Sequence, residues 1–184
     1  MNIHIKTDRL ILRDLELTDA QGIFELDSDP NVQEYLGKHP IKTLKEAEDI
    51  IRFIKKQYKT NGIGRWAVID KSTNQFMGWS GLKYEQELRK GFSYYDLGYR
   101  LIKKYWGKGI GSETAIASIK YGFNTLNLKE ICAAADVNNI ASNKILQKVG
   151  LQFTDTFNYD GALHNWYTIT KPQWLQQYPF PNIF

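Results

Sequence analysis

The stretch YWGKGIGSETA, residues 105–115, has glycines at alternate positions, Gly107, Gly109 and Gly111, followed at once by good helix formers. A glycine-rich turn from a strand into a helix lets backbone N–H groups converge on an anion, helped by the helix dipole. A Walker loop does not fit because Lys108 precedes the last two glycines, and G-x-G-x-G is not the dinucleotide fingerprint. The residues alone leave two interpretations open, a tight structural turn and an anion-binding turn.

Hydrophobic periodicity before this turn predicts one strand, two helices and three further strands. Residues 9–15 alternate as a strand, and Thr18 with Gln21 has capping-box spacing for a first helix. A second box, Thr43 with Glu46, opens a helix with an apolar stripe on one side. The three further strands are expected at residues 64–70, 75–85 and 93–102, the first two as an antiparallel hairpin.

After the turn, the pattern predicts a helix, a strand, a second helix and a closing hairpin. One helical face carries Ile116, Ile119, Phe123 and Leu126. The apolar run 130–137 is strand-sized, so strand, helix and strand form a crossover between parallel neighbours. The remaining elements are a helix at residues 141–150 and a hairpin of residues 151–159 with 164–170.

Length, composition and charge suit one globular domain. The 184 residues are 42% hydrophobic, 14% aromatic and 24% charged, with a formal net charge of +4. We expect a single domain over residues 1–184, in which 171–184 form a proline- and aromatic-rich C-terminal tail. Its last part, YPFPNIF (residues 178–184), is expected to pack as an extended segment or to contact a partner subunit in a homodimer. The small charge excess does not by itself argue for a nucleic-acid partner.

Cysteine usage and hydropathy bear on location and chemistry. The single cysteine, Cys132, excludes an internal disulfide, and the first residues lack the apolar core of a signal peptide, which favours the cytoplasm. No apolar run approaches the roughly 20 residues needed to cross a bilayer, so no membrane partner is expected. We expect no metal site, and we expect Cys132 to be a buried small hydrophobe rather than a carrier of a covalent acetyl group.

Taken together, DLGYRLIKKYWGKGIGSETAIASIKYGF (residues 96–123) and VNNIASNKILQKVGL (residues 137–151) resemble the GNAT acetyltransferase superfamily, specifically its RimJ/RimL-like, ribosomal-protein N-acetyltransferase branch. TDRLILRDLELTDA (residues 7–20) is similar to the same branch. The resemblance implies a mixed α/β (α+β) GNAT fold, whose mostly antiparallel sheet of six to seven strands is splayed between strands four and five and flanked by about four helices. It also implies acetyl-CoA as donor and an amine, peptide or small molecule, as acceptor.

The family motif [QR]-x-x-G-x-[GA] falls on residues 106–111, which implies that the glycine turn holds the CoA pyrophosphate. Trp106 departs from the superfamily pattern but is typical of the RimJ/RimL-like branch. Residues 99–103 lie where the family strand pairs with the pantetheine arm, and Asn139 is implied to lie against that arm, although helix capping explains Asn139 equally well. The implied cofactor-binding residues are Tyr99, Leu101, Ile102, Lys103, Trp106, Gly107, Lys108, Gly109, Ile110, Gly111, Ser112, Glu113, Asn139 and Ser142.

Three catalytic residues are implied by the same resemblance. The Leu101 amide would stabilise the developing oxyanion, and Ser142 would reach the CoA sulfur. Because the usual general-acid tyrosine is replaced here by Leu146, Ser142 is the better candidate for the proton donor, directly or through water. Asp96 occupies the position of a glutamate suggested to deprotonate the amine through water. An exposed carboxylate in a salt bridge is the alternative interpretation of Asp96.

Weaker candidates complete the prediction. Glu85, Glu87 and His164 are alternative bases without a motif behind them. The aromatic residues that either line an acceptor groove or pack in the core are Tyr35, Trp66, Trp79, Tyr84, Tyr94 and Tyr95. The expected activity is direct acetyl transfer to a primary amine, either a protein N-terminus or a small amine such as a polyamine, amino acid or aminoglycoside. A non-catalytic CoA-binding module is the alternative, and a nucleic-acid binder is suggested only by the pI of about 9.0.

Overall fold

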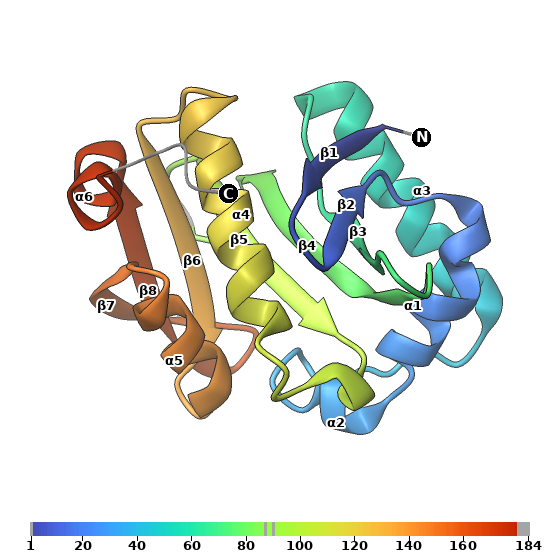
Figure 1. Cartoon of the computed structure of the whole chain (residues 1–184). Coiled ribbons are helices and arrows are strands. Elements are labelled where there is room, and N and C mark those ends of the chain that lie inside the picture. The colour runs from blue at the N-terminus through green and yellow to red at the C-terminus, as the bar shows by residue number, and fades with distance from the viewer. Residues whose placement is uncertain (1, 87, 90, 180–184) are drawn as a thin grey trace.

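The computed structural model describes residues 2–86, 88–89 and 91–179, and the strands in this part of the chain form one eight-stranded sheet in the order β1-β2-β3-β4-β5-β6-β8-β7 (Figure 1). The strands are β1 (Ile3–Lys6), β2 (Leu10–Arg13), β3 (Trp66–Asp70), β4 (Phe76–Glu85), β5 (Tyr94–Leu101), β6 (Glu130–Asp136), β7 (Gln152–Tyr159) and β8 (Ala162–Thr170). The helices are α1 (Ala20–Asp27), α2 (Pro30–Gln33), α3 (Leu44–Asn61), α4 (Ile110–Asn124), α5 (Ile140–Lys148) and α6 (Lys171–Gln177), with 3₁₀ turns η1 (Leu17–Asp19) and η2 (Lys103–Tyr105).

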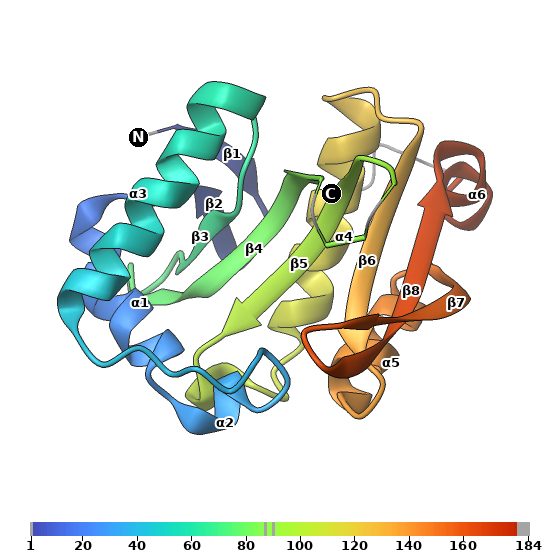
Figure 2. The same ribbon diagram turned by 180° about the vertical axis from the view of Figure 1, so that it is seen from behind.

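The sheet is antiparallel except where β5 meets β6. These two strands run parallel and share one register pair among the described residues, Asp96 with Cys132, whereas β4 and β5 pair throughout residues 78–85. Figure 2 shows the two strands diverging toward their carboxyl ends. The predicted mixed, mostly antiparallel sheet with a splay is therefore confirmed, and the splayed strands are the fourth and fifth counted from β2.

The sheet has one strand more than the sequence predicted, because β1 pairs with β2 ahead of the first expected strand. The chain reverses between them at Thr7, whose amide donates to the Leu10 carbonyl and whose hydroxyl oxygen accepts the Leu10 amide, both at 3.0 Å. Since β1 is only four residues long and has no fully buried side chain, its hydrophobic alternation is weak.

Helices cover both faces of the sheet. In β3, Val68 belongs to the core that packs under α4 and α5, while Ala67 and Ile69 belong to the core under α1 and α3. Figures 1 and 2 show α4 and α5 on one face and α1 to α3 on the other. Because successive strand residues face opposite sides, a strand buried on both faces reads as a continuous apolar run.

The predicted helix starts were right for α3 and wrong for α1. Thr43 and Glu46 form the expected capping box of α3. In front of α1, the reciprocal box is made by Glu16 and Asp19, not by Thr18 and Gln21. The Asp19 carboxylate accepts the Glu16 amide at 2.8 Å and also binds the Arg13 guanidinium, which fixes the chain as a 3₁₀ turn before α1 begins.

The segment after β8 begins with a helix. Thr170 caps α6 in a box with Gln173, and Trp174 is buried against Phe123 of α4. Residues 171–177 of the predicted tail are thus helical, and residues 180–184 lie outside the described residues. None of the described helices is both long and apolar enough to cross a membrane.

Candidate active site

Beyond Asp96, the edge of β5 that faces β6 has no strand pairing among the described residues, and we call this unpaired stretch between the two strands the opening. Ile102 donates its amide to the carbonyl of Met77 in β4, at 3.0 Å. Because successive amides of a strand point to opposite edges, the Leu101 amide points away from β4, into the gap between β5 and β6. Backbone polar groups of Tyr99 and Leu101 therefore line the opening, where the sequence predicted pairing with pantetheine.

The glycine turn lies at the carboxyl end of β5 and passes directly into α4. Gly107 and Gly109 have φ values of 71° and 77°, which L side chains rarely adopt. Gly109 is the N-cap of α4, so the amides of Ile110, Gly111 and Ser112 have no intrahelical acceptor. This local geometry follows from the sequence, because only glycine adopts left-handed backbone at two alternate positions without strain.

The first turn of α4 is fixed from the N-terminal part of the chain. Glu113 accepts the Thr7 hydroxyl at 2.5 Å and two guanidinium bonds from Arg9, at 2.8 and 2.5 Å. Arg9 also donates to the Lys108 carbonyl at 3.2 Å, and the Glu113 amide bonds to the Gly109 carbonyl. The Glu113 amide is therefore already bonded within the helix and is not free to bind the CoA pyrophosphate. The Glu113 side chain instead holds the glycine turn against Thr7 and Arg9.

Trp106 connects the turn to the strand end. Its indole N–H donates to the Leu101 carbonyl at 2.7 Å, although the side chain is 45% exposed. The sequence marked Trp106 as a subfamily feature and as an implied cofactor-binding residue, and the structure adds that its indole holds the carbonyl of Leu101, the residue whose amide faces the opening. Ile102 is buried beside it, and Lys103 opens the short turn η2.

Across the opening, α5 begins with the two residues predicted from the N-x-x-S motif. Asn139 is the N-cap, and its side-chain oxygen accepts the Ser142 amide at 3.0 Å, which confirms the capping interpretation. The Tyr99 hydroxyl of β5 lies 3.2 Å from Ser142 Oγ and 3.1 Å from the Ser142 carbonyl. The structure thus brings Tyr99 and Ser142 together across the gap, a contact that the sequence did not predict.

A buried asparagine holds α5 in place. Asn143 donates to the carbonyls of Asp136 and Asn139, each at 2.8 Å, and accepts hydrogen bonds from Asn165 and Tyr167 of β8, also at 2.8 Å. A buried polar side chain with all these bonds made rigidifies its surroundings. Asn143 therefore fixes the position of Ser142, although no motif drew attention to it.

Asp96 is buried and paired with an arginine. The Arg65 guanidinium donates to the Asp96 carboxylate, to the Asp96 carbonyl at 2.5 Å and to the Gly81 carbonyl. Burial raises the pKa of Asp96, and the positive charge of Arg65 opposes that shift. The alternative interpretation was therefore right about the salt bridge and wrong about exposure, because Asp96 is buried. The role of Asp96 as a base stays a prediction.

Arg65 is a further site residue that sequence reasoning missed. A Cβ at Gly98 would lie 2.6 Å from the Arg65 Nη2 atom, so glycine at this position leaves room for the guanidinium on the sheet. A glycine inside a strand marks a close approach of another group, and Gly98 was the available signal.

The two alternative bases that the structure describes, Glu85 and His164, are bonded to other partners. Glu85 is paired with Lys83 at 2.5 Å and accepts the amides of Gln86 and Leu88, while Glu87 lies outside the described residues. The His164 ring bonds to the Ala162 carbonyl at 3.1 Å. Cys132 is buried as expected, and burial raises the pKa of its thiol to about 12, which disfavours the nucleophilic thiolate.

The predicted groove aromatics separate into two groups. Trp66, Tyr84 and Tyr95 pack into the core under α4, so for these three the core interpretation is confirmed. On the other face of the sheet, Tyr94 is buried in a small core cluster with Cys132 and Trp166, so the core interpretation is confirmed for it as well. Trp79 packs against the core under α1 and α3, and Tyr35 is partly exposed after α2. The guanidinium groups of Arg65 and Arg100 lie over the Trp79 ring at 5.4 and 5.0 Å.

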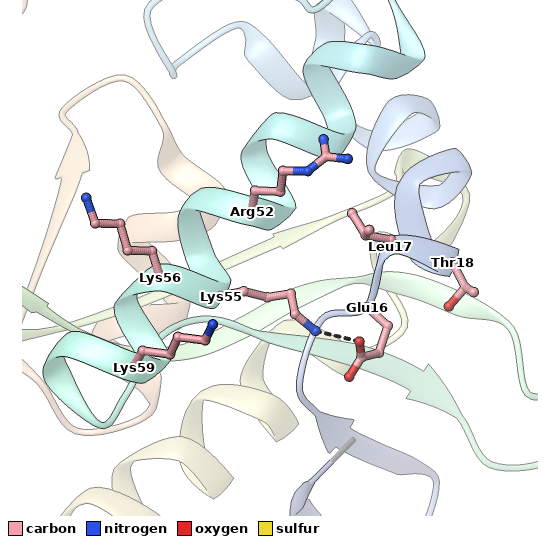
Figure 3. A pocket seen from close by; sticks show the side chains of 7 residues that line it. All are labelled: Glu16, Leu17, Thr18, Arg52, Lys55, Lys56 and Lys59. Atoms are coloured by element: carbon pink, nitrogen blue, oxygen red, sulfur yellow. Dashed lines mark hydrogen bonds and ion pairs between the residues drawn. The ribbon is translucent and has the colours of Figure 1, made fainter.

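A surface pocket of about 580 Å³ lies away from these residues, between η1 and α3 (Figure 3). It is lined by Glu16, Leu17, Thr18, Arg52, Lys55, Lys56 and Lys59. Lys55 is paired with Glu16, and Arg52 is paired with Glu48 and Asp49. None of the lining residues belongs to the predicted site, and two of the four cations are already neutralised by partners.

Comparison with known proteins assigns the chain to a family. The model of the Acetyltransferase (GNAT) domain matches residues 9–152. The chain is 35% identical over 147 residues to the uncharacterised N-acetyltransferase p20 of Bacillus licheniformis, covering 79% of this chain and 80% of p20. A GNAT acetyltransferase of Bacillus anthracis is 25% identical with a TM-score of 0.77, covering 91% of this chain and 98% of that protein.

Two further solved structures share the fold at lower identity. The ribosomal L7/L12 alpha-N-protein acetyltransferase RimL, in complex with coenzyme A, is 15% identical with a TM-score of 0.75, covering 92% of this chain and 98% of that protein. The spermidine N-acetyltransferase of Vibrio cholerae, in complex with CoA and spermine, is 19% identical with a TM-score of 0.73, covering 92% and 99%.

The chain therefore belongs to the GNAT acetyltransferase family and is an acetyl-CoA-dependent N-acetyltransferase. The residues present fit the donor. The glycine turn presents free helix amides to an anion, and a Cβ at Gly107 would meet none of the described atoms within 4 Å, so this side of the turn is open. Acetyl-CoA supplies the activated acetyl group as a thioester.

Proposed function

We propose that this protein is a RimJ/RimL-like enzyme that transfers the acetyl group directly to a primary amine held beside the opening between β5 and β6. The observation that carries the proposal is the Leu101 amide, which points into that opening beside the glycine turn. A fixed backbone N–H at this place would stabilise negative charge that develops on the thioester oxygen during attack.

The donor would be held by backbone groups on both sides of this amide. Amides of Lys108, Ile110, Gly111 and Ser112 would bind the pyrophosphate, aided by the dipole of α4. Tyr99 and Leu101 would pair with the pantetheine arm along the open edge of β5. The Asn139 side chain caps α5, so its contact with the arm would be made beside that role.

Proton transfer would involve Asp96 and Ser142. An aliphatic amine is protonated at neutral pH and must lose a proton before it attacks. Asp96 would accept that proton through water, and its raised pKa makes it a stronger base than an ordinary carboxylate once it is ionised. Ser142, partly buried across the opening, would donate a hydrogen bond to the departing sulfur.

For the acceptor, we propose a protein N-terminal amine first and a small amine second. The RimJ/RimL-like motifs around Trp106 favour the former, and RimL, which acetylates a ribosomal protein, shares the fold. The spermidine acetyltransferase shares it as well, so a polyamine is the leading small-molecule alternative. A cytoplasmic location and a homodimer stay predictions that go with this activity.

The test is release of free CoA thiol from acetyl-CoA in the presence of peptides with free N-termini, polyamines, amino acids and aminoglycosides. We expect release with peptides, and mass spectrometry should find the added acetyl group on the N-terminal amine. Release of CoA thiol with polyamines alone would mean that the acceptor is a small amine and not a protein N-terminus. Binding of acetyl-CoA without release for any amine would identify a non-catalytic CoA-binding module.

A further inference from the structure

The Tyr99 side chain reaches from β5 across the opening to α5. It belongs to β5, and its hydroxyl contacts both the carbonyl and Oγ of Ser142 at the start of α5. Its ring lies beside the first turn of α4, since a Cβ at Gly111 would lie 3.9 Å from the Tyr99 ring. One residue thus meets the strand edge, the glycine turn and the serine predicted to face the CoA sulfur.

The two contacts define how the protons can be arranged. A carbonyl oxygen only accepts, so in one arrangement Tyr99 donates to the Ser142 carbonyl and accepts the Ser142 hydroxyl proton. In the other, Tyr99 donates to Ser142 Oγ, and the Ser142 proton is free to point elsewhere. Rotation of two hydroxyl protons interconverts these arrangements without movement of any heavy atom.

The surroundings keep Tyr99 neutral. Burial raises the pKa of its hydroxyl, so Tyr99 remains a hydrogen-bond donor across the ordinary pH range. The other titratable side chain that acts on it is Tyr167 of β8, whose hydroxyl is held by Asn143 at 2.8 Å. On the next turn of α5, Leu146 is 1% exposed and offers no hydroxyl of its own.

We propose that Tyr99 is a positioning residue that donates a hydrogen bond to Ser142 Oγ and thereby directs the Ser142 proton toward the sulfur of CoA. This inference rests on the proposed function of the opening as the acetyl-CoA site. No bond forms or breaks at Tyr99, because its contribution is a hydrogen bond that passes through Ser142 to the negative charge on the departing sulfur.

The matched variants are Tyr99→Phe, Ser142→Ala, the double variant and a control, Tyr95→Phe. Tyr95 lies on the same strand and the same face, but its ring packs against Tyr84 at 5.4 Å. Tyr99→Phe keeps the aromatic ring and removes only the hydroxyl. Ser142 is partly buried, so Ser142→Ala tests the same pair at a position that tolerates truncation.

The first measurement needs no acceptor. Affinities for CoA and desulfo-CoA are compared by calorimetry between about pH 6.5 and 9.5, so that effects of the phosphates cancel. A site that stabilises the thiolate lowers the pKa of the bound thiol, and preference for CoA therefore rises with pH. Between these pH values, we expect the affinity ratio of CoA to desulfo-CoA to rise about tenfold in the wild type and in Tyr95→Phe. The ratio should rise threefold or less in Tyr99→Phe and should not rise in Ser142→Ala.

The second measurement is turnover of acetyl-CoA with the amine found in the panel. We expect kcat to fall about tenfold in Tyr99→Phe with KM for acetyl-CoA within about twofold, and the double variant to be no slower than Ser142→Ala. Equal kcat and equal pH dependence in wild type and Tyr99→Phe would overturn the proposal, as would additive losses in the double variant. A wild-type CoA preference independent of pH refutes the inference alone, whereas failure to bind CoA or desulfo-CoA refutes the proposed function as well.

Discussion

The helices α4 and α5 begin at the same end of the split sheet, because β5 and β6 are parallel, yet their first turns are built in opposite ways. In α5, the side chain of Asn139 accepts the Ser142 amide. In α4, the N-cap is Gly109 in left-handed backbone, with no side-chain cap bond to the described residues. The capped helix offers a side chain, Ser142, to the opening, whereas the uncapped one offers amides to an anion.

The largest effect is expected from placing a carboxylate on the uncapped turn. Gly109→Glu should lower affinity for acetyl-CoA more than about 100-fold, because it adds negative charge at the proposed phosphate site and strains a residue at φ 77°. Gly62→Glu is the matched control, since Gly62 has φ 70° at the end of α3. Calorimetry should show normal acetyl-CoA binding for the control. If both variants lost the same affinity for acetyl-CoA, backbone strain alone would explain the effect of Gly109→Glu.

Asp96→Asn tests the base across a range of pH. Turnover should fall at least tenfold near pH 7 while acetyl-CoA affinity is kept, and the deficit should narrow as pH approaches the amine pKa, because the amine then loses its proton to solvent. An unchanged rate at pH 7 would remove Asp96 as the base.

The same substitution also tests the ion pair. Asp96→Asn leaves the buried Arg65 without its counter-charge, and loss of one partner of a buried pair costs roughly 3–5 kcal/mol. Urea unfolding should therefore accompany the kinetics, and Arg65→Gln is the matched variant that breaks the pair while it keeps the carboxylate. If Arg65→Gln loses stability but keeps turnover at permissive temperature, the base role and the structural role are separate.

Trp106→Phe should have a moderate effect on turnover. It removes the indole hydrogen bond to the Leu101 carbonyl and keeps most of the ring, so kcat should fall by up to about tenfold, the equivalent of one hydrogen bond of roughly 0.5–1.5 kcal/mol. Trp174→Phe is the control, because Trp174 is buried in α6 away from the opening, so this variant should change stability and leave kcat unaltered. An effect confined to KM would mean that Trp106 contacts the donor and does not hold Leu101.

The smallest effect is expected at the cap of α5. Asn139→Ala should lower the free energy of unfolding by about 1 kcal/mol, and Asn139→Asp should restore it because aspartate is an equally good cap. If KM for acetyl-CoA changes in Asn139→Ala and returns to the wild-type value in Asn139→Asp, as stability does, helix capping explains the whole role of Asn139. A raised KM in the well-capped aspartate variant would support its predicted contact with the pantetheine arm.

Local features were predictable from the sequence because each depends on residues close together in the chain. The glycine turn, the start of α3 at Thr43, the cap at Asn139 and the closing hairpin all follow from short spacings. The capping box before α1 shows the limit of such spacings, because it was predicted at Thr18 and Gln21 and is formed by Glu16 and Asp19. Asp19 is held there by Arg13, and this tertiary ion pair outweighs the Thr18 pattern.

The tertiary structure alone decided which groups meet at the opening. Asp96 pairs with Arg65, Glu113 with Thr7 and Arg9, and Tyr99 with Ser142. These partners are far apart in the chain, and their contacts depend on which strands are neighbours and on the single register pair that leaves β5 and β6 apart. Periodicity reports which face of an element is buried, but it carries no information about what packs against that face. The sequence by itself determined where the glycine turn and the helix after it lie, and the fold determined which side chains surround them.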